Sequence, residues 1–382
     1  MKILTIGCGH IGSVIIKDLA KALPSAEITI SDTKLKRAKE TASTIGMDKV
    51  CFMELDVSDR KNVVKALTDF DLAVGLTPGK VGYKAISAVI QAGVDMVDLS
   101  YMAENPLTLN DAALDAGICV IPDCGVAPGL SNLLVGRAVS QLDEVHEVSI
   151  LVGGLPETPI PPLNYTVTWC VEDLIKGYVR DALIIKDGKM VKVEALDGLE
   201  DVEFPGVGRL EAFYTDGLRT LHQTIKGVRN MWEKTLRYPG HVEKIKVLRS
   251  LGFFSETPVS VGDVRVVPLD LASVLLEQKL SMPGVKDILA MSVAVEGFAN
   301  GMLTRYLFRL LDRYDEQQQI TAMARTTAYT ASIIIQLLAQ GVIKERGIVP
   351  PEALGMNHVV FDAVMTELEK KGIQVNTSVK YN

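Results

Sequence analysis

The chain has 382 residues, of which 48% are hydrophobic and 23% are charged; this composition excludes a disordered chain and predicts two or three folded domains. Its 47 acidic and 40 basic residues give a formal charge of −7, which argues against binding to nucleic acid or to an anionic membrane. The five cysteines form no CxxC pair and no apolar run reaches the ~20 residues of a membrane span, so we expect a cytoplasmic protein with reduced thiols and no metal site.

The first 125 residues alternate short apolar, β-rich segments with amphipathic segments, and the two patterns exchange repeatedly. The strand-like runs ILTI at 3–6 and ICVI at 118–121 are apolar throughout, so neither of their faces can lie in water. Strands joined by helical crossovers form a parallel sheet with helices on both faces. The sequence therefore predicts a doubly wound α/β (Rossmann) domain.

After Gly125 the pattern changes to strands joined by hairpins. The Asp187-Gly188 pair between two β-rich runs predicts one such hairpin. The other expected elements are helices at Leu130–Gln141, Glu172–Arg180, Gly217–Ile225 and 327–343, and strands at His146–Val152, Lys286–Val295 and Met302–Leu310. Hairpin-linked strands predict a second, α+β domain with a mixed or antiparallel sheet, which we expect to bind the substrate.

The motif GCGHIG follows the first predicted strand and opens the first predicted helix. Gly7 permits a tight turn, Gly9 permits close approach of a pyrophosphate to the backbone, and Gly12 permits close packing of helix on strand. Asp32 ends the second strand, where a carboxylate accepts hydrogen bonds from the ribose hydroxyls and repels the 2′-phosphate of NADP. The sequence therefore predicts NAD, although the basic residues at 34, 36 and 37 either hold a phosphate or form a solvated helix face.

The loops that follow the later strands complete the predicted cofactor site. Asp56 ends the third strand, where it either lies beside the adenine or caps the end of the strand. The residues expected to contact the cofactor are Gly7, Gly9, His10, Ile11, Gly12, Asp32, Asp56, Val57, Thr77, Pro78 and Ser100.

A set of motifs along nearly the whole chain resembles the saccharopine dehydrogenase family. They are GCGHIG, LTPG at 76–79, VDLSYMAENP at 97–106, PDCGVAPGLSN at 122–132, NYTVTW at 164–169, DGLRT at 216–220, TLRYPGH at 235–241, MARTTAYTAS and VPPEALG. The resemblance implies a Rossmann domain at 1–125 that is closed by a returning C-terminal segment at about 325–382, and a substrate and oligomerisation domain at 126–324. It also implies a homo-oligomer, either a dimer or a dimer of dimers, that uses NAD.

The blocks TVTW and TLRYPGH are most similar to the family members that oxidise the ε-amine of L-lysine, which implies oxidative deamination of a small amino acid. Hydride transfer from an amine requires a base near the nicotinamide to remove the ammonium proton. The reaction zone of a doubly wound sheet lies at the carboxyl ends of its strands. Asp123 directly follows a buried strand there, and acts as the base, caps the next helix or braces the turn at 125–129.

Arg237 and His241 flank the Pro239-Gly240 turn in the second domain. The arginine fork suits a substrate α-carboxylate and histidine titrates near neutrality, although an ordinary ion-pairing arginine and a helix-start histidine are the alternatives. The resulting catalytic candidates are Asp123, His241 and Tyr101, and the substrate-binding candidates are Arg237, Arg219, Trp169 and Cys124. We expect Asp123 and His241 to converge where the second domain closes over the nicotinamide.

Two other functions are compatible with the same motifs. One is an NADP-dependent saccharopine-type or carboxynorspermidine-type reductase, which forms a C–N bond. The other is a dinucleotide-binding protein that senses a ligand or assembles with partners without turnover. The intact glycine triad and the candidate base favour an enzyme.

Overall fold

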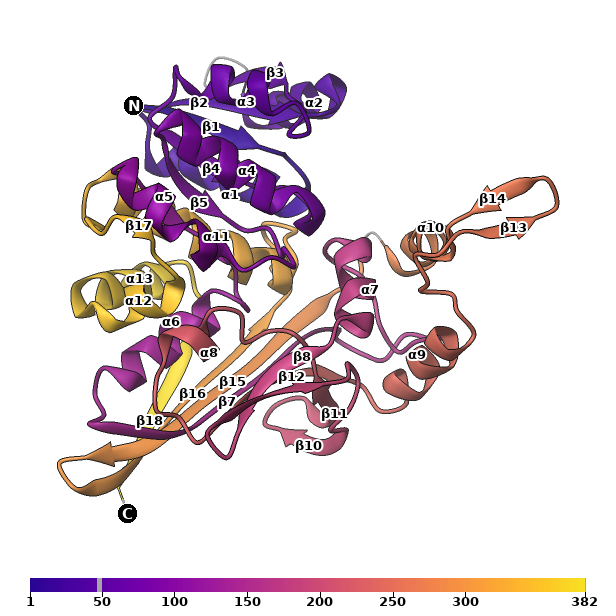
Figure 1. Cartoon of the computed structure of the whole chain (residues 1–382), viewed down its shortest axis with the longest axis vertical. Coiled ribbons are helices and arrows are strands. Elements are labelled where there is room, and N and C mark those ends of the chain that lie inside the picture. Colours follow the sequence, from indigo (N-terminus) through magenta and orange to yellow (C-terminus); the bar gives the residue numbers. More distant parts are fainter. Residues whose placement is uncertain (47–49, 283, 382) are drawn as a thin grey trace. The chain divides into compact units, whose positions relative to one another are not determined.

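The computed structural model describes residues 1–46, 50–282 and 284–381. The chain divides into two compact units (Figure 1). The first consists of Met1–Ser140, Arg219–Leu221 and Ala324–Ile373, and the second of Gln141–Leu218, His222–Met323 and Gln374–Asn382. The first unit therefore extends past the predicted boundary at residue 125 and takes in a short segment from the middle of the chain.

A seven-stranded parallel sheet in the order β17-β6-β5-β4-β1-β2-β3 forms the centre of the first unit. Its strands are β1 (Lys2–Ile6), β2 (Glu27–Asp32), β3 (Val50–Glu54), β4 (Leu72–Gly75), β5 (Asp95–Asp98), β6 (Cys119–Ile121) and β17 (Gly347–Ile348). Strands β2 and β3 lie on one side of β1 and the later strands lie on the other, so the strand order reverses at β1. This is the doubly wound topology, and the predicted fold class is confirmed.

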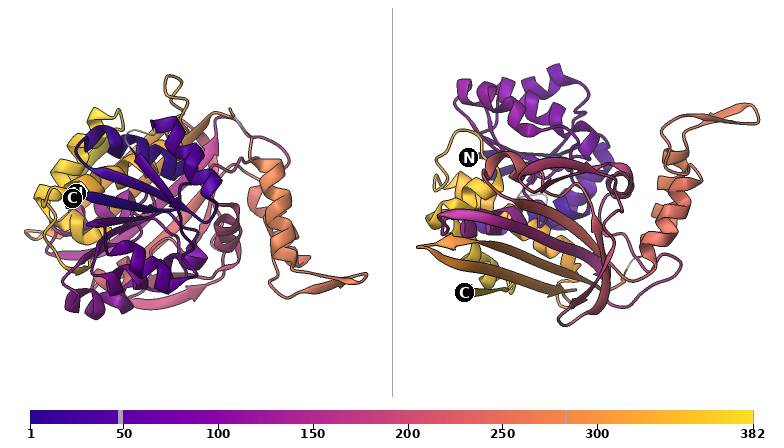
Figure 2. Two further views of the ribbon diagram at one scale, coloured as in Figure 1. Left: turned by 90° about the horizontal axis from the view of Figure 1, so that it is seen from above. Right: turned by 60° about the horizontal axis from the view of Figure 1, so that its bottom comes forward.

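Helices cover both faces of this sheet (Figure 2). They are α1 (His10–Ala22), α2 (Leu35–Ile45), α3 (Arg60–Leu67), α4 (Gly79–Ala92), η1 (Pro106–Leu109), α5 (Asn110–Asp115), α6 (Leu130–Val139), α11 (Ala322–Ala339), α12 (Pro351–Met356) and α13 (His358–Lys370). Ile3 and Leu4 point to opposite faces of β1 and both have no exposed surface. The uninterrupted apolar runs in the sequence thus correspond to strands that are buried on both faces.

The returning C-terminal segment contributes β17, which pairs in parallel with β6. Helix α11 begins earlier than predicted because the Asp287 carboxylate accepts hydrogen bonds from the backbone N–H groups of Ala322, at 2.6 Å, and Met323, at 3.0 Å. The segment also ends earlier than the predicted residue 382. The last strand, β18 (Val375–Tyr381), pairs antiparallel with β16 in the second unit.

The second unit contains a nine-stranded mixed sheet in the order β10-β11-β12-β7-β15-β16-β18, with β8 beside β12 and β9 beside β8. Its strands are β7 (Glu144–Pro156), β8 (Ala182–Lys186), β9 (Lys189–Val193), β10 (Glu200–Phe204), β11 (Gly208–Tyr214), β12 (Asn230–Arg237), β15 (Asp287–Ala299), β16 (Met302–Arg313) and β18. Only β12 and β7 run parallel among these described strand pairs. The predicted mixed sheet is confirmed.

Backbone dihedral angles explain why the predicted hairpin of the second unit forms and why one predicted helix is shorter than expected. The β8–β9 hairpin turns at Asp187 and Gly188, whose φ angles of 49° and 73° suit a tight two-residue turn. The helix predicted at Gly217–Ile225 shortens to α8 (Leu221–Thr224). Arg219 has a φ of 55°, which a right-handed helix cannot contain.

The remaining helices of the second unit are α7 (Val171–Val179), α9 (His241–Ser250) and α10 (Pro268–Leu280). One apolar cluster joins all three helices to the buried Tyr165 and Phe213. A hairpin of β13 (Val259–Val261) and β14 (Val264–Val266) precedes α10 and projects with it from this unit (Figures 1 and 2). None of the described helices combines the length and the apolar character needed to cross a lipid bilayer.

Candidate active site

The glycine-rich turn of the first unit leaves room for a phosphate group. Gly7 has a φ of 103°, and a side chain there would come within 2.6 Å of the backbone oxygen of Leu76. Gly12 packs equally closely, because an added Cβ would lie 2.9 Å from the Leu76 side chain. Gly9 caps α1 without a side-chain hydrogen bond, and no other described atom lies within 4 Å of its Cβ position. The open space and the free N–H groups at the start of a helix fit a pyrophosphate.

Asp32 ends β2 at the same edge of the sheet and is 7% exposed. One carboxylate oxygen accepts a hydrogen bond from the backbone N–H of Lys34 at 3.0 Å. The other lies 3.7 Å from the guanidinium of Arg37, whose side chain is half exposed. A carboxylate for the ribose hydroxyls and a cation suited to a 2′-phosphate therefore lie side by side.

Other predicted cofactor residues occupy the same edge. His10 and Ile11 form the first turn of α1, and Pro78 precedes α4 without a side-chain cap on that helix. The hydroxyl of Thr77 follows β4 and is buried, and it has no hydrogen-bond partner among the described residues. A bound ligand at this edge would satisfy that hydroxyl.

Asp56 and Val57 have local roles at the end of β3. The Asp56 carboxylate accepts a hydrogen bond from the backbone N–H of Ser58 at 2.8 Å, and this bond lowers its pKa. Val57 is 6% exposed and belongs to the apolar core. Of the two interpretations of Asp56, the capping one has a contact in the structure, and the adenine one stays a prediction.

A buried ion pair lies beyond the carboxyl end of β6. The Nε of Arg219 donates to the Asp123 carboxylate at 3.0 Å, and the two side chains are 4% and 0% exposed. The φ angles of Asp123 and Arg219 are 53° and 55°, a region that residues other than glycine seldom occupy. The Arg219 guanidinium also lies over the Tyr101 ring, 5.2 Å from its centroid. These contacts join Arg219 to two predicted catalytic residues, and its predicted role in binding substrate stays a prediction.

Asp98 is a second buried acid near the Asp123–Arg219 pair, and it was not among the residues predicted from the sequence. It ends β5 with no exposed surface and accepts hydrogen bonds from the backbone N–H, at 3.0 Å, and the hydroxyl of Ser100. Burial, together with the nearby Asp123, raises the pKa of Asp98 to about 8. Asp98 therefore holds a proton at neutral pH. Its position in VDLSY, directly after an apolar strand, is the signal that could have identified it.

Cys124 follows Asp123 and has no exposed surface. Its backbone N–H donates to the carbonyl of Asp98 at 2.9 Å, which ties together the loops after β5 and β6. Burial raises the pKa of the Cys124 thiol far above its ordinary value. Cys124 is therefore unsuited to nucleophilic chemistry, because the reactive form of cysteine is the thiolate.

Arg237, at the end of β12 in the second unit, is a buried cation that forms no ion pair with a carboxylate of the described residues. It is 4% exposed, and its guanidinium lies 4.3 Å from the centroid of the Tyr165 ring. Its Nε makes no hydrogen bond, and no carboxylate of the described residues forms an ion pair with it. Burial acts to lower the pKa of Arg237, but Tyr165, Tyr178 and Glu233 outweigh it and raise the pKa. The arginine therefore keeps its charge, and none of the described carboxylates lies within ion-pair distance of it.

His241, at the start of α9, has no exposed surface. Its Nδ1 lies 2.8 Å from the carbonyl oxygen of Leu163, which can only accept, so Nδ1 carries the proton. Its Nε2 then accepts from the Tyr178 hydroxyl at 2.9 Å. Burial, together with Arg237, lowers the pKa of His241 to about 3. The predicted titration of His241 near neutral pH is wrong, because the fold removes water from the ring; the imidazole orients Tyr178.

Glu233 lies two residues before Thr235 and four residues before Arg237, so these three side chains share one face of β12. It is 4% exposed and accepts a hydrogen bond from the Thr215 hydroxyl at 2.7 Å. Burial raises the pKa of Glu233 to about 8. The sequence analysis missed Glu233, although the alternation in WEKTLR could have indicated that it shares a face with Arg237.

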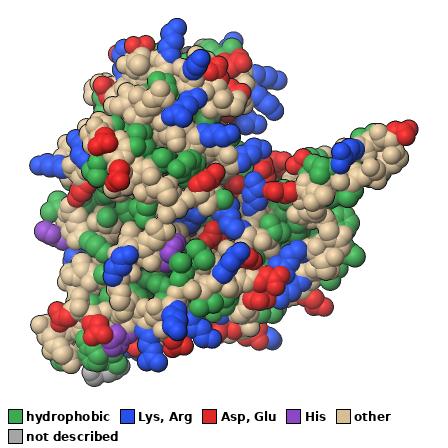
Figure 3. All heavy atoms as spheres, in the orientation of Figure 1, with side chains coloured by type: hydrophobic (Ala, Val, Ile, Leu, Met, Phe, Trp, Pro, Cys, Tyr) green, Lys and Arg blue, Asp and Glu red, His purple; other side chains and the backbone are tan. Residues whose placement is uncertain are grey.

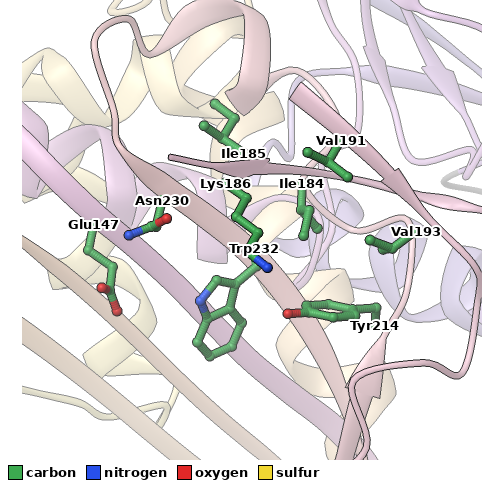
Figure 4. A pocket seen from close by; sticks show the side chains of 9 residues that line it. All are labelled: Glu147, Ile184, Ile185, Lys186, Val191, Val193, Tyr214, Asn230 and Trp232. Carbon is green, nitrogen blue, oxygen red and sulfur yellow. The ribbon is translucent and has the colours of Figure 1, made fainter. Parts of the chain in front are cut away.

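Trp169 packs against the apolar cluster of the second unit, and its Nε1 donates to the Tyr165 hydroxyl at 3.3 Å. A cavity of about 370 Å³ lies elsewhere in this unit, lined by Trp232, Tyr214 and the β8–β9 hairpin (Figure 4). Trp232 and Arg237 point to opposite faces of β12, since they are an odd number of residues apart. The cavity is therefore separate from the Arg237 cluster.

The buried acids predict that the protein loses stability in mild alkali. Asp98 and Glu233 have folded pKa values of about 8, against roughly 4 for exposed carboxyls, so the folded state binds more protons from about pH 4 to 8. His241 acts oppositely but only below about pH 6.5, because its folded pKa is about 3. The free energy of unfolding should fall from pH 6.5 to 8, by at most ~1.4 kcal/mol per pH unit for each acid.

Urea unfolding at several pH values measures this slope. Asp98→Asn and Glu233→Gln should each flatten it. Asp95→Asn, which alters a carboxylate at the opposite end of β5, should leave it unchanged. Parallel slopes in all four proteins would contradict the assignment of the buried protons.

Comparison with known proteins places the chain in a family. Residues 3–121 match the model of the saccharopine dehydrogenase NADP binding domain, and residues 125–373 match that of the saccharopine dehydrogenase C-terminal domain. The chain is 27% identical to saccharopine dehydrogenase [NADP(+), L-glutamate-forming] of Schizosaccharomyces pombe over 67% of its own length and 58% of that protein. It is 23% identical to the enzyme of the same name from Pyricularia oryzae over 99% of its own length and 98% of that protein.

A third relative is the carboxyaminopropylagmatine dehydrogenase of a Synechocystis species, which is 21% identical over 91% of each chain. Among solved structures, the apo saccharopine dehydrogenase (L-Glu forming) of Saccharomyces cerevisiae superposes with a TM-score of 0.79. That comparison covers 99% of both chains at 20% identity and shows the shared fold. Because the two family models together cover nearly the entire sequence, this chain belongs to the saccharopine dehydrogenase family.

Proposed function

We propose that the chain is an NAD-dependent dehydrogenase that removes the side-chain amine of a free amino acid, as an L-lysine 6-dehydrogenase does. Lysine, NAD and water would give 2-aminoadipate 6-semialdehyde, ammonia, NADH and a proton. One observation carries the proposal: Arg237 is a buried, charged guanidinium without a carboxylate partner among the described residues. A buried charge is costly until it is paired, and the α-carboxylate of an amino acid supplies the missing anion.

The surrounding residues have roles that suit this substrate. The bound dinucleotide would accept the hydride from the carbon that bears the amine. Asp123 accepts the ammonium proton, and Asp98 is a second proton carrier because its pKa is about 8. Tyr101 and Arg219 fix the position of Asp123, while the hydrogen bond from Tyr178 to His241 orients a tyrosine that raises the pKa of Arg237. The convergence of Asp123 and His241 at one nicotinamide stays a prediction.

The alternative is an NADP-dependent reductase of the saccharopine type, which joins an amino acid to a semialdehyde. Relatives named as NADP(+)-dependent saccharopine dehydrogenases favour it, and so does the exposed Arg37 beside Asp32. A binding protein without turnover has the least support. The buried, proton-holding Asp98 beside the Asp123–Arg219 ion pair would be a cost without benefit in such a protein.

An absorbance assay at the NADH wavelength separates these functions. The protein is mixed with NAD or NADP and a panel of amino acids and diamines. We expect turnover with lysine, and poor turnover with cadaverine, which has the amine but lacks the carboxylate that Arg237 would bind. Turnover only with glutamate, an aldehyde and NADPH would establish the reductase. Equal kcat/KM for lysine and cadaverine would remove the carboxylate clamp from the proposal.

Asp32 is expected to set the preference for NAD over NADP. Removing its carboxylate in Asp32→Ala removes the repulsion of a 2′-phosphate, so NADP should bind more tightly and NAD more weakly, and the preference should shrink by about tenfold. Arg37→Ala, at the neighbouring cation, should instead weaken NADP alone. Titration of each variant with both cofactors measures the two affinities. An unchanged ratio in Asp32→Ala would show that Asp32 does not contact the ribose.

A further inference from the structure

The face of β12 that carries Arg237 also carries a buried acid. Glu233 and Arg237 lie four residues apart on this strand, so their side chains point to the same face of the sheet, and each residue is 4% exposed. Burial is the largest influence on the pKa of each group. Arg237 also acts to lower the pKa of Glu233, and Glu233 acts to raise that of Arg237, so the two groups are close enough to interact. No ion pair joins them, although both are described residues.

Burial distinguishes these two residues from the charges on the surface. Acidic and basic side chains lie among one another on the face shown in Figure 3, where water solvates them. The exposed pair of Arg209 and Asp201, at 2.9 Å in the same unit, is worth little because water stabilises both charges when they separate. Arg237 and Glu233 are removed from water, and a buried polar group that lacks its partner is costly. A ligand that carries both a carboxylate and an ammonium group would pair with both residues at once.

The segment that follows β11 holds the carboxyl group of Glu233 in place. The Thr215 hydroxyl donates a hydrogen bond to its Oε2 at 2.7 Å. A Cβ at Gly217 would lie 2.3 Å from the carboxyl carbon of Glu233, so the absence of a side chain there permits this close approach. An ionised carboxylate can accept about four hydrogen bonds, so the bond from Thr215 leaves capacity for a ligand. Glu233 is therefore both positioned and able to accept from an ammonium group.

The other charged groups around Glu233 do not neutralise it. Burial, followed by Asp216 in the loop after β11, raises the pKa of Glu233 to about 8, and Arg237 lowers it only in part. Asp216 is itself paired with Arg180, at 3.2 Å. The Glu233 carboxyl of the ligand-free protein therefore keeps its proton at pH 7. An ammonium group placed beside it favours the ionised form, so the binding of such a ligand releases this proton to the solvent.

We propose that Glu233 is a specificity-determining residue that binds the α-ammonium group of the substrate while Arg237 binds the α-carboxylate, a role that rests on the proposed function. The side-chain amine of the substrate loses its proton to Asp123 in that reaction, so the α-ammonium is the cation that remains for Glu233. The two residues have opposite charges when the ligand is bound, and they fix the direction in which the head group of a free α-amino acid lies. A simple amine or a simple carboxylate satisfies only one of them.

Calorimetric titration with norleucine and hexanoate tests this role without turnover. Both ligands have a carboxylate and the same carbon chain, neither has a side-chain amine, and only norleucine has the α-ammonium group. With the dinucleotide bound, the wild-type protein should bind norleucine about 10- to 100-fold more tightly than hexanoate, because a hydrogen bond between charged groups contributes that much. Glu233→Gln should remove this difference and change the affinity for hexanoate by less than about twofold.

The same titrations in two buffers of different ionisation enthalpy count the protons that binding releases. Norleucine should release about one proton from the wild-type protein at pH 7 and none from Glu233→Gln, and hexanoate should release none from either. The matched control is Glu200→Gln, because Glu200 pairs with Lys234, whose side chain lies on the opposite face of β12. This control should bind norleucine as the wild type does. Arg237→Met should instead weaken the binding of both ligands.

Kinetics with 6-aminohexanoate, which has the carboxylate and the side-chain amine of lysine but no α-amine, separates this role from the reaction itself. The wild-type enzyme should prefer lysine in kcat/KM by about 10- to 100-fold, and Glu233→Gln should oxidise both compounds equally. Equal kcat/KM for the two compounds in the wild type would overturn the role of Glu233 and leave the proposed reaction intact. If lysine is not oxidised but norleucine still binds more tightly to the wild type than to Glu233→Gln, the reaction is wrong and the role of Glu233 stands. A wild-type protein that binds norleucine no more tightly than hexanoate, or a Glu233→Gln variant that binds norleucine as tightly as the Glu200→Gln control, would overturn the role.

Discussion

Replacing Arg237 with methionine is expected to lower kcat/KM for a carboxylate-bearing amine substrate by about 10²- to 10⁴-fold. A bidentate contact between a guanidinium and a carboxylate makes two charge-assisted hydrogen bonds, each worth about 1.5–3 kcal/mol, and methionine makes neither. The loss should appear mainly as a higher KM, because the carboxylate is bound equally in the ground and transition states. Cadaverine, which has no carboxylate, should be oxidised equally by both proteins.

The stability of the same variant separates a ligand-binding arginine from a structural one. Arg237 is buried and forms no ion pair among the described residues, so its removal breaks no ion pair there, and the melting temperature should stay constant or rise. Arg180→Met is the contrasting control, since Arg180 pairs with Asp216 at 3.2 Å in the same unit and its loss should lower the melting temperature. A destabilised Arg237→Met enzyme with an unchanged KM would show that Arg237 only supports the fold.

The features that the sequence predicts well depend on local spacing. Gly7, Gly9 and Gly12 follow a strand at fixed intervals, and the resulting turn and open helix end form as expected. Asp32 is placed correctly at the carboxyl edge because strand ends can be read from the apolar pattern. The Asp187-Gly188 turn is equally local, since a two-residue hairpin is defined by its own dihedral angles.

The features that the sequence does not predict depend on distant partners. Asp287 is the first residue of β15, and its carboxylate caps the start of α11, 35 residues later in the chain. In the sequence, Arg219 resembles an ordinary helical arginine. In the folded chain it pairs with Asp123, which lies 96 residues earlier. His241 has the ordinary pKa of histidine in the sequence, and it loses that property only because Tyr178, Leu163 and Arg237 surround it and exclude water. Residue type alone cannot give burial, and burial determines these pKa values.

The buried acids are an intermediate case. Asp98 and Glu233 each interrupt or end an apolar strand, and a carboxyl in that position either pairs or becomes protonated. The strand pattern therefore could have marked both residues as unusual. It could not have said which of the two outcomes applies, because the charged groups with the largest effect on each pKa, Asp123 for Asp98 and Asp216 for Glu233, come from other elements.

Replacing Asp123 with asparagine is expected to lower kcat by about 10²- to 10⁴-fold, the usual contribution of a positioned base, with little effect on cofactor affinity. Asparagine has the same shape and tolerates the φ of 53° at this position, so the loop after β6 should keep its conformation. The substitution also removes the charge that pairs with Arg219, and breaking a buried ion pair costs about 3–5 kcal/mol of stability. Activity must therefore be measured per folded molecule, at a temperature well below the lowered melting point.

The pH profile distinguishes a base from a structural anion. If Asp123 takes the proton, the acidic limb of the kcat profile should change in Asp123→Asn, because the residual rate would then follow the loss of the proton from Asp98, whose pKa the Asp123 charge no longer raises. Asp95→Asn, at the amino end of β5, is the control: its carboxylate accepts a hydrogen bond from the backbone N–H of Cys119 at 2.8 Å and lies away from the reaction edge. A folded Asp123→Asn enzyme with wild-type kcat and an unchanged acidic limb would leave Asp123 as the counter-ion of Arg219 and assign the proton to Asp98, the buried carboxyl that ends the neighbouring strand β5.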